Sequence, residues 1–277
     1  MNDMSLKAKI RNTAKENGIP AQLVLQQYFN ERFLLRLSMT GYKEKFVVKG
    51  GALIASIVGL SNRATMDMDT TLKDLPLTPD AIRDAIVTIC AVDTGDGIKF
   101  DFIRLEPIRE DDLYGGYRVM MEANYGKIAA PMSMDVSTGD IITPGAVQRE
   151  FETMFDDKEF CLWSYNVETI LAEKVETILN RNVYSTRPRD FYDLYALSKT
   201  EVYDKEIFQE ALNATARHRH SSDKIKNVDD LLLLITKSDD LQKLWNKYRK
   251  QFAYAKEIDY GEIMETLAEL LVNVEIK

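Results

Sequence analysis

Residues 49–72 read KGGALIASIVGLSNRATMDMDTTL, and this segment limits the fold more than any other part of the chain. KFVVKG, which runs into the glycine pair, predicts a short buried strand, and GALIASIVGL predicts a helix that opens at the glycines. TMDMDTTL predicts a second strand that carries two aspartates one residue apart. This order places the glycine turn and the two carboxylates at adjacent strand ends, on one edge of a sheet.

The two aspartates, Asp67 and Asp69, are expected to share one face of their strand. Residues i and i+2 of a strand point to the same side, about 6.5–7 Å apart along the backbone. Two carboxylates held that way repel each other unless a cation lies between them, and Mg²⁺ is a hard ion that prefers oxygen ligands. A pair of such ions can activate an attacking oxygen and neutralise the leaving group of a phosphoryl transfer. The alternative is a solvated edge strand in which Asp and Met alternate.

The glycine pair, Gly50 and Gly51, lies where a strand passes into a helix. Free backbone N–H groups and the positive end of the helix dipole attract phosphate at such a position, and glycine lets a ligand approach the main chain closely. Any tight strand-to-helix turn would also use glycine. The combination with the Asp-x-Asp strand therefore favours a phosphate site more than the glycines do alone.

A third carboxylate is found in APMSMDVSTGD, where Asp135 is near the end of an apolar strand. An unpaired charge is costly there, so Asp135 is expected to have a partner. It is either a third metal ligand or the base for an attacking hydroxyl. Asp140 is interpreted as a residue that caps a turn.

The rest of the chain predicts a mixed α/β part followed by a helical part. An amphipathic helix is expected at 20–38 after a shorter one at 5–17, and Thr78 is the expected N-cap of a further helix. Three β-rich stretches, GIKFDFIRLEPI, GYRVMMEANY and KIAAPMSMDVS, are separated by turns such as EDDLYGG. After residue 165 the periodicity becomes helical, with segments at 166–181, 187–198, 202–215, 226–252 and 259–273. Two domains are predicted, residues 1–165 and 166–277.

Composition excludes several classes of protein. The formal net charge of −8 argues against indiscriminate nucleic-acid binding, although Lys and Arg cluster at 174–189 and 243–256. The polar N-terminus and the absence of a long apolar run predict a cytoplasmic protein without a membrane segment. Cys90 and Cys161 are expected to be buried reduced thiols, and the two histidines, His218 and His220, are expected in a solvated basic loop rather than at a zinc site.

Several stretches, taken in order, resemble one family: YFNERFLLRLSMTGYKEKFVVKGGALI, NRATMDMDTTL, IRLEPIREDDLYGGYRVMMEA, MSMDVSTGD, and ETILAEKVETILNR followed by RPRDFYDLYAL. The chain is similar to the AbiEii/AbiGii toxin family of nucleotidyltransferases, within the DNA polymerase beta-like superfamily. The resemblance implies an α+β fold, a polymerase-beta-like mixed sheet with flanking helices, followed by a C-terminal helical bundle. It also implies the toxin of a type IV toxin–antitoxin or abortive-infection system, with an NTP substrate, Mg²⁺ and a cognate antitoxin.

The family pattern also implies roles for individual residues. Gly50 and Gly51 become the phosphate-binding turn, and Asp67, Asp69 and Asp135 the metal-binding acidic positions. Lys174 in AEK and Asp190 in PRD become the signature of the helical part, with Lys174 on nucleotide phosphates. Arg63 and Thr65 are two further candidates for phosphate contacts, whereas Lys49 is interpreted as a structural residue.

Three functions follow from these observations. The first is transfer of a nucleoside monophosphate from an NTP to RNA, with the tRNA 3′ end implied by the resemblance. The second is the same transfer to a protein hydroxyl or a small molecule, which the net charge of −8 favours. The third is a module that binds NTP without turnover.

Overall fold

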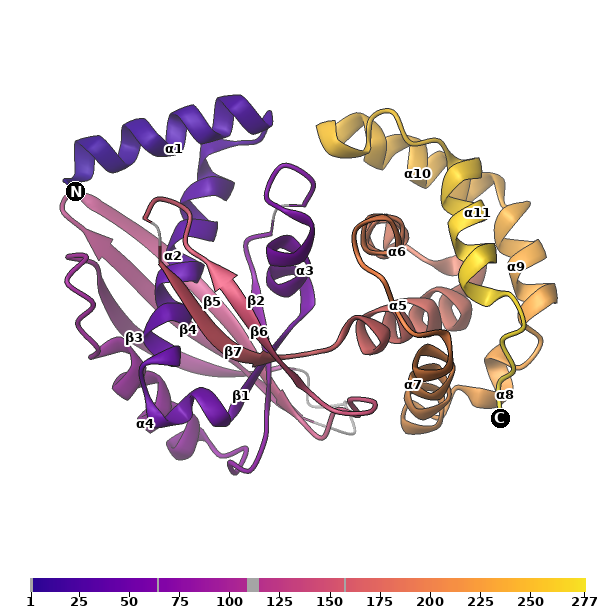
Figure 1. The fold of residues 1–277 in the computed structure, drawn as a ribbon, viewed down its shortest axis with the longest axis horizontal. Coiled ribbons are helices and arrows are strands. Elements are labelled where there is room, and N and C mark those ends of the chain that lie inside the picture. Colours follow the sequence, from indigo (N-terminus) through magenta and orange to yellow (C-terminus); the bar gives the residue numbers. More distant parts are fainter. Residues whose placement is uncertain (1, 64, 109–114, 157) are drawn as a thin grey trace. The chain divides into compact units, whose positions relative to one another are not determined.

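The computed structural model describes residues 2–63, 65–108, 115–156 and 158–277. The predicted turn EDDLYGG lies mostly outside these residues. The chain divides into two compact units, whose elements can be followed by their labels in Figure 1. Unit one contains residues 1–140 and 146–164, and unit two contains residues 141–145 and 165–277.

Unit one is built on a mixed sheet. Within the described residues it has seven strands in the order β3-β4-β5-β2-β1-β7-β6. β2 runs parallel to β5, and β1 runs parallel to β7, while the other neighbouring pairs are antiparallel. The strands are β1 Phe46–Lys49, β2 Met68–Leu72, β3 Lys99–Ile108, β4 Gly116–Tyr125, β5 Ile128–Thr138, β6 Val147–Glu152 and β7 Glu159–Ser164.

The two faces of β4 and β5 differ in polarity because their residues alternate with period two. Val119, Met121, Met134 and Val136 are fully or almost fully buried on one face. α2 and α4 cover the sheet here, α2 against β5 and α4 against β3 (Figure 1). The opposite face carries the polar residues at the alternate positions, and the candidate site lies on that face.

Four α-helices of unit one were expected from the sequence, and all four form. They are α1 Asp3–Asn17, α2 Ala21–Ser38, α3 Gly50–Val58 and α4 Pro79–Cys90. Thr78 is the N-cap of α4, and its side chain accepts from the Ala81 N–H, as predicted. A 3-10 turn, η1 Gly41–Glu44, precedes β1.

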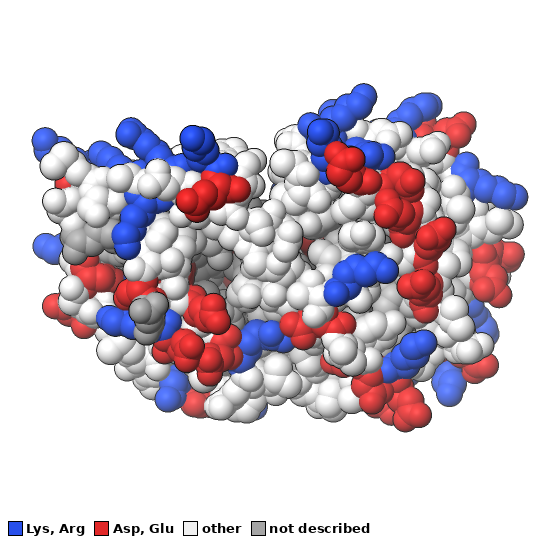
Figure 2. Space-filling view, turned by 45° about the horizontal axis from the view of Figure 1, so that its top comes forward, with Lys and Arg blue, Asp and Glu red and all other residues white. Residues whose placement is uncertain are grey.

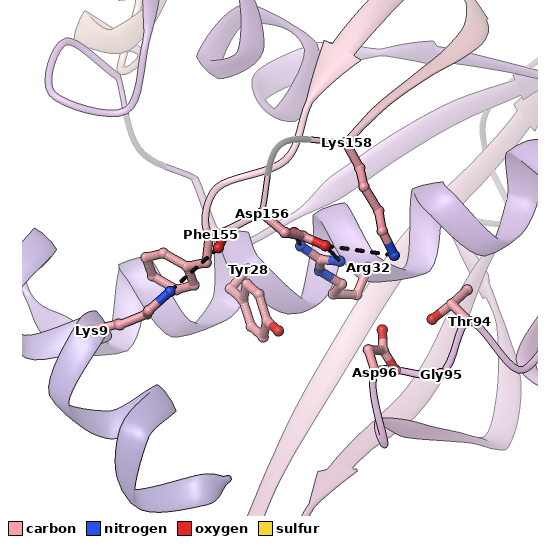
Figure 3. Close-up of a pocket in the computed structure, with 9 residues that line it drawn as sticks. All are labelled: Lys9, Tyr28, Arg32, Thr94, Gly95, Asp96, Phe155, Asp156 and Lys158. Atoms are coloured by element: carbon pink, nitrogen blue, oxygen red, sulfur yellow. Dashed lines mark hydrogen bonds and ion pairs between the residues drawn. The ribbon is translucent and has the colours of Figure 1, made fainter. Parts of the chain in front are cut away.

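α2 is buried around almost its whole circumference, which its amphipathic pattern does not indicate. Arg32 and Arg36 on its polar side are both almost completely buried, and each is neutralised by acidic partners. Arg36 pairs with Asp96 at 2.7 Å. Arg32 pairs with Glu31 at 2.9 Å and with Asp156 on the turn between β6 and β7 (Figure 3). These ion pairs attach two distant loops to the helix.

Unit two is helical within the described residues. Its longest helices pack against one another, α5 against α6 and α7, and α5 buries an apolar stripe that includes Leu171, Val175 and Ile178. The helices are α5 Val167–Arg181, α6 Pro188–Thr200, α7 Lys205–His218, α8 Ser222–Ile225, α9 Val228–Thr236, α10 Asp239–Gln251 and α11 Tyr260–Leu271, with the 3-10 turns η2 Asn182–Tyr184 and η3 Ala253–Ala255. The α+β fold class is thus confirmed.

Some local expectations were wrong. β2 begins at Met68, so Asp67 precedes the strand rather than lying within it. The hairpin β6–β7 was not anticipated, although it supplies the parallel neighbour of β1. Cys161 lies on the exposed face of β7, so only Cys90, which is partly exposed, approaches the expected burial of the thiols. The segment 226–252 forms two helices because the chain breaks at Lys237 and Ser238.

Candidate active site

A row of charged side chains crosses the polar face of the sheet, one from each of the four neighbouring strands β4, β5, β2 and β1. Asp69 on β2 is the register partner of Lys49 on β1 and of Asp135 on β5. Asp135 is in turn the partner of Arg118 on β4. Register partners on neighbouring strands share a face and lie about 4.8 Å apart between strands. The sheet therefore brings together two of the predicted carboxylates, which are 66 positions apart in the sequence.

Asp69 fits against the glycine turn. Gly50 has a φ of +67°, which favours glycine, and a Cβ added there would lie 2.0 Å from Oδ2 of Asp69. The backbone N–H of Gly51, at the start of α3, donates to the same carboxylate. Glycine is thus required at position 50 because the Asp69 side chain occupies the space that a Cβ needs.

Arg63 and Thr65 lie on the other side of this turn. A Cβ on Gly51 would meet Thr65 Oγ1 at 2.9 Å and a guanidinium nitrogen of Arg63 at 3.2 Å. Both side chains are almost completely buried. Asp67 is exposed, and its backbone N–H donates to Thr65 Oγ1 at 3.4 Å. Both proposed phosphate contacts therefore surround the glycine turn.

The third carboxylate, Asp135, is held by a bidentate ion pair. The Nε and Nη2 atoms of Arg118 donate to its two oxygens at 2.7 and 2.8 Å. Arg118 was not singled out in the sequence. Lys49, the residue of the row on β1, is also neutralised, because it pairs with Asp140. It also donates to Ser137 Oγ at 2.8 Å. Asp140 is therefore the counterion of Lys49, and this ion pair joins β1 to the segment after β5.

The electrostatics of Asp69 follow from this crowding. Burial raises the pKa of its carboxyl, and the charges of Asp135 and Asp67 raise it further. Lys49 and the Gly51 N–H act in the opposite direction but do not reverse the shift. A carboxylate whose charge is disfavoured by burial and by like charges gains most from a bound cation.

The donor set fits Mg²⁺ by its chemistry. Three aspartates supply the oxygen ligands that this ion prefers, and the Asp69 carboxylate stands in a space that only glycine leaves open. Among the described residues, no three or more His, Cys, Asp or Glu side chains are disposed as they stand to hold a metal. Both oxygens of Asp135 accept from Arg118 in this arrangement.

The predicted residues of unit two, Lys174 and Asp190, take part in a buried cluster of charges. Lys174 on α5 pairs with Asp190 at 2.5 Å and with Asp193 at 2.9 Å, both on α6. Arg187 pairs with Asp190 at 2.9 Å. Burial lowers the pKa of Lys174, but the charges of Asp193 and Asp190 outweigh it, so the pKa is raised. The sequence did not single out Asp193, which is completely buried. Its spacing of three from Asp190 on a helix was the available signal.

The pocket shown in Figure 3 is a different feature of unit one. It has a volume of about 240 Å³ and is lined by α1, α2, the 94–96 loop and the β6–β7 turn. None of the predicted site residues lines it. Among its charged groups, Asp156 pairs with Arg32 and with Lys158, the latter at 3.8 Å. This pocket therefore lies outside the candidate active site.

Basic side chains gather over α1 in unit one and over α10 in unit two (Figure 2). On α10, Lys243, Lys247 and Lys250 are exposed, so the predicted 243–256 cluster is a surface feature. The 174–189 cluster differs, because Lys174 and Arg187 are paired with aspartates.

The sheet and its glycine turn define a nucleotidyltransferase-like fold, and one solved structure has a similar fold. A candidate nucleotidyltransferase from Helicobacter pylori is 17% identical, with a TM-score of 0.50 over 92% of this chain and 97% of its own. JHP933 from H. pylori is 17% identical with a TM-score of 0.49, over 89% of each chain. An antigenic nucleotidyltransferase-like protein from Paracoccidioides brasiliensis is 14% identical with a TM-score of 0.42, over 88% of this chain and 91% of its own.

The family profile described as nucleotidyl transferase AbiEii toxin, type IV TA system, matches residues 32–269. The chain therefore belongs to the AbiEii family of nucleotidyltransferase toxins. No match was found among the curated proteins. Through the described part of the chain, no helix combines the length and apolarity that crossing a membrane requires.

Proposed function

We propose that this protein is a Mg²⁺-dependent nucleotidyltransferase that moves a nucleoside monophosphate from an NTP to the 3′ end of an RNA, with tRNA as the expected acceptor. The observation that carries the proposal is the placement of Asp69 beside Asp135 on neighbouring strands, against the glycine turn at the start of α3. The exposed lysines of α10 support a polyanionic acceptor.

In this reaction the acceptor hydroxyl oxygen forms a bond to the α-phosphorus of the NTP. The bond from that phosphorus to the β-phosphate bridging oxygen breaks, and pyrophosphate leaves. Asp67, Asp69 and Asp135 would hold Mg²⁺, which supplies neutralisation of the charge on the triphosphate. The N–H groups at the start of α3, with Arg63 and Thr65, would bind phosphate oxygens. Asp135 remains the alternative candidate for the base that takes the hydroxyl proton.

The roles implied by the family for Lys174 and Asp190 stay predictions. We also infer that the enzyme acts as a toxin restrained by a cognate antitoxin, because the family is a type IV toxin–antitoxin family. Residues 1–165 are proposed as the catalytic domain and residues 166–277 as the helical domain, both acting in the cytoplasm.

The test is a labelling experiment. The purified protein is incubated with each α-³²P-labelled NTP, Mg²⁺ and either total tRNA or cell lysate, with and without EDTA. Label in RNA that disappears with EDTA supports the proposal. Label in protein or in a small molecule would show that the acceptor is not RNA. Binding of NTP without transfer would show that the protein is an NTP-binding module rather than an enzyme. Asp69→Ala is the site control, and it must abolish labelling if the assignment is correct.

Growth on induced expression tests the toxin role. Wild type is expected to arrest growth, and Asp67→Ala is expected to relieve the arrest. Equal growth of both strains at equal protein levels would contradict the role as a toxin.

A further inference from the structure

Arg118 occupies a position that the proposed function leaves unexplained. It is the register partner of Asp135 on β4, and its guanidinium holds both oxygens of that carboxylate. Its charge also acts on Asp67 and Asp69. One guanidinium therefore lies within electrostatic reach of all three acidic side chains that are proposed to hold the metal.

This pairing competes with metal binding. A carboxylate whose two oxygens both accept from a guanidinium cannot direct either of them to a cation without losing that contact. Lys49, the other cation of the row, is engaged by Ser137 and Asp140, whereas Arg118 donates to both oxygens of Asp135. In this structure both oxygens of Asp135, the third proposed ligand, are held by Arg118 rather than directed to a cation.

Arg118 is also able to leave. Its side chain is 47% exposed, and an exposed arginine pair is readily exchanged for another partner. The planar guanidinium binds phosphate in the same two-pronged way as it binds carboxylate. A triphosphate brought to the glycine turn supplies such a partner on the same face of the sheet.

We propose that Arg118 is a positioning residue that exchanges Asp135 for the phosphates of an incoming NTP. The exchange releases Asp135 to the metal only when nucleotide is present. Metal and nucleotide then bind cooperatively, and the protein alone binds divalent cations weakly. This proposal rests on the nucleotidyltransferase function proposed above, and it adds an order to the assembly of the site.

The experiment measures Mn²⁺ binding by the EPR signal of the free ion, with no acceptor and no turnover. Wild type, Arg118→Gln and Arg118→Lys are titrated alone and with non-hydrolysable α,β-methylene analogues of the four NTPs. Arg104→Gln is the matched control, because Arg104 is an exposed arginine on the adjacent strand β3 that pairs with Glu106 at 2.6 Å. Thermal unfolding confirms that each variant is folded.

Wild type is expected to bind Mn²⁺ about tenfold more tightly with the analogue than without it, the ratio that about 1.4 kcal/mol of coupling produces. Arg118→Gln is expected to bind Mn²⁺ more tightly than wild type when alone, to lose the enhancement by nucleotide, and to bind the analogue more weakly. Arg118→Lys, which keeps the charge without the fork, is expected to fall between them. Arg104→Gln should match wild type.

Unchanged Mn²⁺ affinity in folded Arg118→Gln, or a nucleotide enhancement that persists in it, would overturn the proposed exchange while leaving the nucleotidyltransferase function intact. A different result would contradict the nucleotidyltransferase function itself. If wild type binds no Mn²⁺ with any of the four analogues, both that function and the proposed exchange are wrong.

Discussion

A Cβ on Gly50 would lie 2.0 Å from Oδ2 of Asp69, so the side chain of Asp69 occupies the space that a side chain at position 50 would need. The backbone at Gly50 is also left-handed, with φ at +67°. These two features make position 50 the most sensitive in the candidate site, and they allow a direct test.

Gly50→Ala is expected to abolish function. The methyl group must displace Asp69, and a misplacement of about 1 Å at a reacting centre costs about 100-fold in rate. The left-handed backbone adds about 1–2 kcal/mol of destabilisation. NMP transfer and thermal unfolding are measured together. Gly41→Ala is the control, because a Cβ there meets nothing within 4 Å. A Gly50→Ala protein that transfers label at the wild-type rate would disprove the assignment of this turn.

Asp69→Asn is expected to remove transfer while stabilising the fold at pH 8. Burial and the neighbouring charges of Asp135 and Asp67 raise the pKa of Asp69. The contribution of this group to stability is therefore full below its unfolded-state pKa and is lost as the pH rises through the folded-state pKa. A neutral amide has no charge to bury and avoids that loss. We expect the free energy of unfolding to rise by about 1 kcal/mol, the gain typical of replacing an unfavourable functional residue. Urea unfolding measures it, with Asp84→Asn as the surface control, and a less stable Asp69→Asn would contradict it.

Lys174→Met is expected to destabilise the protein by about 3–5 kcal/mol, because it leaves Asp190 and Asp193 as buried carboxylates without their shared cation. Arg187 still pairs with Asp190, so the loss is concentrated at Asp193. Guanidinium unfolding gives the value. Lys243→Met on exposed α10 serves as the control and should stay within about 0.5 kcal/mol of wild type. Wild-type stability combined with lost transfer in Lys174→Met would show that Lys174 has a catalytic rather than a structural role.

Glu31 is expected to make stability depend on pH. Burial raises the pKa of its carboxyl to about 7, despite its partner Arg32 and the Met154 N–H that donates to it at 2.6 Å. The folded protein binds this proton more tightly than the unfolded chain, so the stability from Glu31 is present at pH 4.5 and lost as the pH rises to about 7. The change is on the order of 3 kcal/mol.

The measurement for Glu31 is a difference between variants. The free energy of unfolding is determined from pH 5 to 8 for wild type, Glu31→Gln and the exposed control Glu16→Gln. Subtracting the free energy of unfolding of Glu31→Gln from that of wild type at each pH removes the contributions of the other titrating groups. The Glu31→Gln variant should lose the decline with pH, whereas Glu16→Gln should keep it. Parallel curves for all three proteins would show that Glu31 does not titrate in this range.

Much of unit one could be predicted because its signals are local. The capping threonine and apolar periodicity identified α4, and the alternation of residues identified β4 and β5. β2 was predicted too long. Asp67 fits the alternation of polar and apolar residues expected of a strand, but it has no partner residue on β1 or β5. The hairpin β6–β7 was missed because its residues are mixed in polarity, and β6 is an edge strand with little buried surface.

The candidate site was predictable in its residue types but not in its partners. Asp135 was expected to need a partner because its strand is apolar. That the partner is Arg118 follows only from the β4–β5 register. Asp193 was missed for the same reason, since a helical aspartate shows its burial only once α5 lies against α6. Asp140 was assigned to a turn, whereas the structure pairs it with Lys49.

The amino-acid order alone determined the glycine turn, the spacing of the acidic residues and the division between strand-rich and helical segments, because these depend on backbone preferences and on the periodicity of neighbouring residues. Only the tertiary structure decided which charges meet. Ion pairs such as Arg118 with Asp135 and Arg32 with Asp156 join residues from separate elements, and their formation depends on strand register and helix packing, which no local pattern encodes.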